Sequence, residues 1–145
     1  MELTDEIIEH MMNPKNYGKL ENPDGVGVGY DERSGEYVIM YLVSKDDALS
    51  EIAYATNGCQ DTVVLGSVFT EMVKGAAQDE AKQIAQKMQE KVAQAPAQQQ
   101  ACSELVLSAF NAAMENLAHR AQGGDQELHK IRIASSCETE EEETK

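Results

Sequence analysis

The feature that most constrains the fold of this chain is a change of hydrophobic periodicity near Gly58. Before this residue, apolar residues follow a period of two, which predicts strands over 26–30, 36–43 and 51–56. After it they recur every three or four positions, which predicts helices over 60–74, 78–93 and 102–121. Strands followed by helices indicate an α+β fold, with helices packed on one face of a small antiparallel three-stranded sheet.

A short amphipathic helix is predicted over residues 5–12, ahead of the strands. Thr4 is suited to cap its first turn, and Asn13-Pro14 ends it because a residue before proline disfavours the α conformation. Its apolar residues share one face, which comprises Ile7, Ile8, Met11 and Met12.

The end of the chain is strongly acidic. Residues 135–145 contain five Glu and one Lys. Such a segment cannot bury enough apolar area to offset the entropy lost on ordering. We therefore expect one folded domain over residues 1–122, as suits 145 residues, and a disordered acidic tail over 123–145.

The net charge of −14 argues against two classes of partner. Nucleic acids and anionic membranes are both polyanions, so we expect the chain to bind neither. No apolar run approaches the ~20 residues needed to cross a bilayer, and the N-terminus lacks the pattern of a signal peptide. We therefore expect a cytoplasmic protein, whose thiols stay reduced.

Two of the three cysteines, Cys59 and Cys102, fall at the start of predicted helices, whereas Cys137 lies in the acidic tail. A helix N-terminus lowers the pKa of a thiol and favours the thiolate, which binds metals and attacks electrophiles. The alternative is that each cysteine is a small apolar residue of the core. Without a CxxC motif or a Cys/His spacing typical of zinc sites, the residues alone leave both interpretations open.

Catalytic signatures are missing from the sequence. It contains no GxGxxG, P-loop or GxSxG motif. The three histidines, His10, His119 and His129, are expected to be solvated at the surface, and none lies near Cys59 in sequence to act as its base. We therefore expect a protein that is not an enzyme.

Four short motifs occur in order along the chain: HMMNPKNYGKLENPDGVG (10–27), ATNGC (55–59), FTEMVKGAAQDEA (69–81) and ACSELVLSAFNAAM (101–114). In this order, and with compatible spacing from about residue 4 to 120, they resemble the IscU/NifU-type iron–sulfur cluster scaffold family. The resemblance implies a NifU-like N-terminal domain that receives sulfur from a cysteine desulfurase. Such a domain takes iron from a donor, assembles a [2Fe–2S] cluster, and passes it to acceptor proteins.

The resemblance also implies which residues hold the cluster. Cys59 and Cys102 match the second and third cysteines of the family, and Glu36 stands where the family has an aspartate. Ser34 replaces the first cysteine, and Ala101 replaces a histidine, so this is a divergent member lacking the first ligand cysteine. The expected ligands for a [2Fe–2S] cluster or iron, with zinc as an occupant in purified protein, are therefore Cys59, Cys102 and Glu36.

Two alternatives remain open at this point. Cys137 is either a free tail thiol or a third thiolate for the site. The chain itself is either a scaffold with a weakened site or a metal-free interaction module for the cluster assembly machinery. In both cases the expected partners are a cysteine desulfurase and iron–sulfur acceptor proteins, and the expected state is a monomer or weak homodimer.

Overall fold

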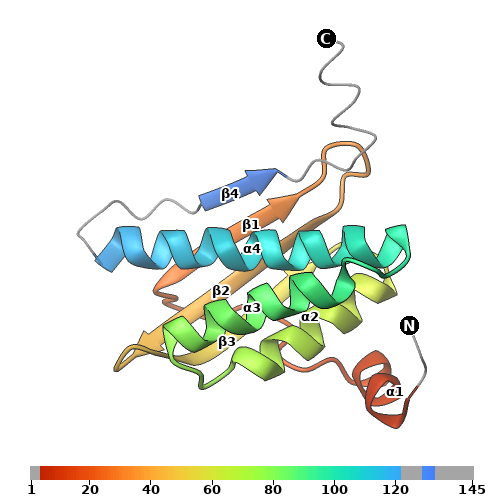
Figure 1. Cartoon of the computed structure of the whole chain (residues 1–145). Coiled ribbons are helices and arrows are strands. Elements are labelled where there is room, and N and C mark those ends of the chain that lie inside the picture. Colours follow the sequence, from red (N-terminus) through yellow and green to blue (C-terminus); the bar gives the residue numbers. More distant parts are fainter. Residues whose placement is uncertain (1–3, 122–128, 133–145) are drawn as a thin grey trace.

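A four-stranded sheet with helices on one face forms the body of the protein (Figure 1). The computed structural model describes residues 4–121 and 129–132. Its elements, in chain order, are α1 (Asp5–Met12), β1 (Gly25–Tyr30), β2 (Tyr37–Lys45), β3 (Ala48–Thr56), α2 (Gln60–Val73), α3 (Gln78–Val92), α4 (Ala97–Ala121) and β4 (His129–Arg132). The strand order is β3-β2-β1-β4, with β1, β2 and β3 antiparallel. The predicted α+β fold with its three antiparallel strands is confirmed.

The fourth strand is an addition to that prediction. β4 pairs in parallel with β1, so that Gly27 lies opposite His129 and Tyr30 opposite Arg132. It lies within residues 123–145, and for these four residues the expected disorder is wrong. The edge of β1 would otherwise leave a row of backbone groups unpaired, which a short added strand satisfies. The other residues of the expected tail, Cys137 included, lie outside the described residues.

The last helix is longer at its start than predicted. α4 begins at Ala97, so the expected loop over 95–101 is mostly helical. Alanine and glutamine are good helix formers, and this propensity outweighs the low complexity of the segment. The side chain of Gln100 donates to the carbonyl oxygens of Ala93 and Ala95, at 3.0 and 2.7 Å, and so caps the end of α3.

The core lies between the sheet and α2, α3 and α4. Its largest fully buried side chains include Tyr54, Phe69 and Phe110, and the two phenylalanine rings pack edge to face with centroids 4.9 Å apart. α4 lies directly on β1, because Gly25, Gly27 and Gly29 face it and present only backbone. Among the described residues, no helix combines the length and the apolar character that crossing a membrane requires.

The first helix is held to α2 by a histidine. The predicted solvated position is wrong for His10, which is 7% exposed, although His119 is exposed as expected. The hydroxyl oxygen of Ser67 accepts a hydrogen bond from the backbone N–H of Lys15 at 2.7 Å and lies 2.5 Å from Nδ1 of His10. Since this oxygen already accepts one bond, its own proton is free to be donated to the imidazole. The predicted apolar face, by contrast, leaves Ile8 and Met12 exposed.

Replacing Ser67 by alanine is expected to loosen this attachment. The change leaves the N–H of Lys15 and the ring of His10 without their partner, and should lower the free energy of unfolding by about 1–3 kcal/mol. Urea unfolding followed by far-UV circular dichroism measures the loss. Ser108→Ala, on α4, is the matched control and should cost less than about 0.5 kcal/mol. Equal losses in the two variants would contradict the assigned role of Ser67.

Candidate functional site

The fold brings two cysteines together that are distant in the sequence. Cys59 follows β3 and is the N-cap of α2, whereas Cys102 lies in the second turn of α4. Their sulfur atoms are 3.8 Å apart. We call Cys59 and Cys102 the thiol pair. Cys59 is exposed and Cys102 is only 3% exposed, so the pair has one open and one covered sulfur.

The spacing of the thiol pair suits a shared metal ion. Metal–sulfur bonds of about 2.3 Å at the tetrahedral angle place two sulfurs about 3.8 Å apart. The observed separation has the same value, so two thiolates here would need little rearrangement to bind one iron or zinc ion. Thiolates are soft ligands, and proteins use them to coordinate iron, zinc and iron–sulfur clusters.

The two thiols ionise differently. Partial burial raises the pKa of Cys59, but hydrogen bonds from the backbone and hydroxyl of Thr62, from Cys102 and from the backbone of Asp61 outweigh it, so its pKa lies below the ordinary value. Burial raises the pKa of Cys102 to about 11. The prediction of a helix N-terminus is therefore confirmed for Cys59 and wrong for Cys102, because α4 starts at Ala97.

Thr62 is a residue of the site that the sequence analysis did not single out. Its side chain is fully buried, and its hydroxyl oxygen lies 3.8 Å from the sulfur of Cys59. It also lowers the pKa of Cys102 through a hydrogen bond. Its position three residues after an N-cap is the local signal that could have identified it.

Replacing Thr62 by valine should slow the alkylation of Cys59. Removing the hydroxyl withdraws a group that favours the thiolate, so the pKa of Cys59 rises and less thiolate is present at pH 7. A lost hydrogen bond of this kind corresponds to a roughly threefold to tenfold lower rate with iodoacetamide. Peptide mass spectrometry measures the alkylation of Cys59 separately from that of the other cysteines. Thr62→Ser keeps the hydroxyl and should react like the unchanged protein; a similar slowing in both variants would contradict the assignment.

The turn that contains Ser34, Gly35 and Glu36 is tied to the loop before Cys59. The side chain of Asn57 donates to the carbonyl oxygen of Gly35 at 3.0 Å and accepts from the backbone N–H of Tyr37 at 2.8 Å. Gly35 has a φ of +77°, a conformation that favours glycine. The structure therefore places this turn beside the segment that leads to the thiol pair.

The third expected ligand does not complete a metal site in the described arrangement. Within residues 4–121 and 129–132, no three His, Cys, Asp or Glu side chains form a group that could hold a metal ion. The backbone of Glu36 is fixed, since its N–H donates to the hydroxyl of Ser34 at 3.2 Å and its carbonyl accepts from Asp31 at 2.9 Å. Its carboxylate does not join the thiol pair in such a group.

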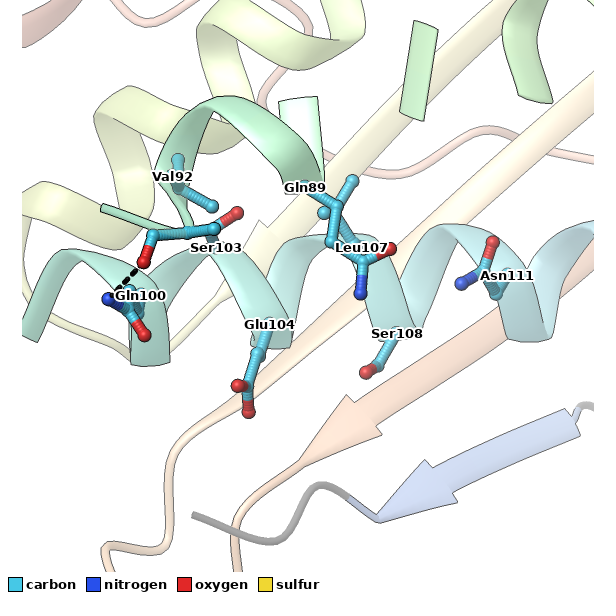
Figure 2. Close-up of a pocket in the computed structure, with 9 residues that line it drawn as sticks. Gln89, Val92, Gln100, Ser103, Glu104, Leu107, Ser108 and Asn111 are labelled. Atoms are coloured by element: carbon cyan, nitrogen blue, oxygen red, sulfur yellow. Dashed lines mark hydrogen bonds between the residues drawn. The ribbon is translucent and has the colours of Figure 1, made fainter. Parts of the chain in front are cut away.

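A separate cavity of about 240 Å³ lies between α3 and α4 (Figure 2). Figure 2 shows Gln89 and Val92 reaching into this region from α3, and polar residues of α4 on its other side. Burial raises the pKa of Glu104 at its edge, and the charge of Asp31 adds to this. Neither cysteine of the thiol pair lines the cavity.

Comparisons with known proteins agree with the resemblance seen in the sequence. The chain is 33% identical over 112 residues to the iron-sulfur cluster assembly scaffold protein IscU 1 of Archaeoglobus fulgidus, covering 77% of this chain and 73% of that protein. It is 29% identical to the scaffold protein IscU of Aquifex aeolicus, covering 99% and 93%. A crystal structure of an N-terminal NifU-like protein from Brucella abortus has the same fold, with a TM-score of 0.67, 21% identity and coverage of 79% and 93%.

The family itself follows from a further match. The model of the NifU-like N-terminal domain family matches residues 2–123, which include the strands β1 to β3, the four helices and the thiol pair. This match and the identity to a curated scaffold protein confirm the resemblance carried by the four sequence motifs. The chain therefore belongs to the NifU-like N-terminal domain family.

Proposed function

We propose that the protein is a scaffold that binds iron or a [2Fe–2S] cluster at the thiol pair and passes it to acceptor proteins. The observation that carries this proposal is the 3.8 Å separation of the two sulfurs. The names of the curated relatives, which are iron–sulfur cluster assembly scaffolds, support it. The cluster or ion is cargo in this role, so the protein acts by binding and release and not as an enzyme.

The ligands we propose are the thiolates of Cys59 and Cys102 and the carboxylate of Glu36. Glu36 would have to turn its side chain toward the thiol pair, and water would complete the coordination. Because Cys59 is exposed, cargo held there stays accessible to a partner. With two thiolates, the site would hold its cargo less firmly than a site with three, which favours transfer. Zinc prefers the same ligands and would occupy the site in purified protein.

We further propose that a cysteine desulfurase supplies the sulfur, in the cytoplasm, and that acceptor proteins take the cluster. An exposed thiolate with a lowered pKa, such as Cys59, is the form of cysteine that accepts sulfur from another protein. The net charge of −14 supports soluble protein partners in place of nucleic acid or membrane.

Anaerobic reconstitution with iron and sulfide tests the proposal. We expect visible sulfur-to-iron charge-transfer absorption in the unchanged protein, and its loss in Cys59→Ser and in Cys102→Ser. Cys137→Ser is the matched control and should retain the absorption. Glu36→Gln should retain it with a faster loss of iron to a chelator. If the unchanged protein acquires no absorption, or if the double variant of the thiol pair acquires the same absorption, the proposal is wrong.

A second candidate is a metal-free module that docks a desulfurase or an acceptor. The replacement of two expected ligands by Ser34 and Ala101 favours it, as does the missing third ligand in the described arrangement. In this case the protein should co-purify with a desulfurase without metal, and binding should persist in the double variant of Cys59 and Cys102. Loss of binding in that variant would count against the module.

A further inference from the structure

The thiol pair has a second property that metal binding does not require. Its sulfurs would have to approach from 3.8 Å to the roughly 2.05 Å of a disulfide bond. Cys59 is the residue able to make this movement. It is an N-cap with extended backbone, and it is exposed. A side chain at this position is not confined by a preceding helical turn, so its χ1 angle can rotate.

The two sulfurs also differ in how a small oxidant reaches them. Cys59 is open to solvent, whereas Cys102 is 3% exposed and lies behind it in α4. An oxidant therefore meets Cys59 first, and the sulfur of Cys102 lies 3.8 Å from the sulfur that has been oxidised. This is the arrangement in which a first oxidation product is captured by a second cysteine.

We propose that the thiol pair is an oxidation site, at which a hydroperoxide converts Cys59 and Cys102 into an intramolecular disulfide. The Cys59 thiolate attacks one peroxide oxygen, the O–O bond breaks, and the leaving hydroxide takes up a proton as water. Cys59 is then a sulfenic acid. The sulfur of Cys102 attacks it, the S–O bond breaks, and a second water leaves. Two thiols and one hydrogen peroxide give one disulfide and two waters, so the sulfurs lose the two electrons that the peroxide gains.

The disulfide closes the site to cargo. A disulfide offers no thiolate, and so neither sulfur can ligate iron in the oxidised state. A dithiol reductant restores both thiolates. This consequence for cargo rests on the proposed function, whereas the disulfide itself does not.

The test uses the full chain with Cys137→Ser, reduced and free of metal, so that only the thiol pair carries thiols. One equivalent of hydrogen peroxide should lower the intact mass by about 2 Da, the two hydrogens lost in a disulfide. Peptide mapping should then find the segments containing Cys59 and Cys102 linked. Dithiothreitol should reverse the change. If Cys59 is oxidised to sulfinic acid while Cys102 remains a free thiol, the inference is overturned.

Single variants separate the roles of the two sulfurs. In Cys102→Ser, Cys59 should stop at a sulfenic acid or proceed to a sulfinic acid, with oxygen added to the mass. In Cys59→Ser, oxidation of Cys102 should slow by about tenfold or more, because this sulfur is buried. Equal rates in the two variants would contradict the order of the steps.

The same samples distinguish this inference from the proposed function. Cobalt(II) added to the reduced protein should give thiolate-to-cobalt absorption, and prior oxidation should remove it. Disulfide formation without cobalt binding in the reduced protein would support the oxidation site and contradict the cargo site. Cobalt binding without disulfide formation would support the cargo site and contradict the oxidation site.

Discussion

A valine in place of Gly27 is expected to prevent the chain from folding. A Cβ atom at this position would clash with the backbone nitrogen of Ala113, and would lie 2.5 Å from the carbonyl carbon of Ala112 and 2.6 Å from the carbonyl oxygen of Ala109. All three atoms belong to the backbone of α4, so no side-chain rotation relieves the overlap. Even Gly27→Ala should lower the free energy of unfolding by about 3 kcal/mol or more, at or above the usual limit for overpacking.

Thermal and urea unfolding followed by circular dichroism measure this effect. Val28→Ala is the control, because Val28 is the next residue of β1 and points to the opposite face of the sheet. It removes a half-buried side chain without touching α4, and should cost about 1–2 kcal/mol. If Gly27→Ala were as stable as the unchanged protein, the close contact of α4 with β1 would be wrong.

Introducing a cysteine at Ser34 should produce the largest gain in cargo binding. Ser34 stands where the resemblance to the family expects the first ligand cysteine. The bonds of Asn57 to Gly35 and Tyr37 hold this turn beside the loop that leads to Cys59. A third thiolate would replace a hydroxyl that ligates iron poorly near neutral pH. We expect iron or cobalt(II) to bind at least about tenfold more tightly, since each added ligand lowers the free energy of the bound state.

Competition with a chromophoric chelator measures the affinity of Ser34→Cys, and cobalt(II) absorption counts its thiolate ligands. Ser50→Cys carries the same added thiol in β3, near the end of the strand that is distant from Cys59, and should leave the affinity unchanged. A gain of the same size in both variants would indicate binding unrelated to the site. No gain in Ser34→Cys would show that the turn does not reach the thiol pair.

Periodicity predicted the elements well where it was strong. The helix over residues 5–12 agrees with α1 in both bounds, and the strands and the next two helices agree within a few residues. The predicted helix over 102–121 begins later than α4, because the Gln-rich segment before Cys102 has no apolar stripe to indicate a helix. β4 was missed because four residues in an acidic setting carry too little apolar pattern to stand out.

The site was predicted in part. The sequence placed Cys59 and Cys102 at separate elements, and only the packing of α2 against α4 determines that their sulfurs meet. Burial of His10 was missed for a similar reason, since its partner Ser67 is 57 residues away. The segment with the alternating glycines of β1 is predicted as a strand from the sequence. That these glycines also allow α4 to pack closely on β1 depends on which helix crosses them.

The position of α4 on β1 also has a consequence for the synthesis of the protein. β1 leaves the ribosome before α2, α3 and α4 but packs mainly against α4, and closing so long a segment slows folding. The thiol pair likewise requires Cys102, near the start of α4. A nascent chain that ends before α4 therefore has an uncovered β1 and only one thiol of the pair, so the proposed binding of cargo requires that α4 has been translated.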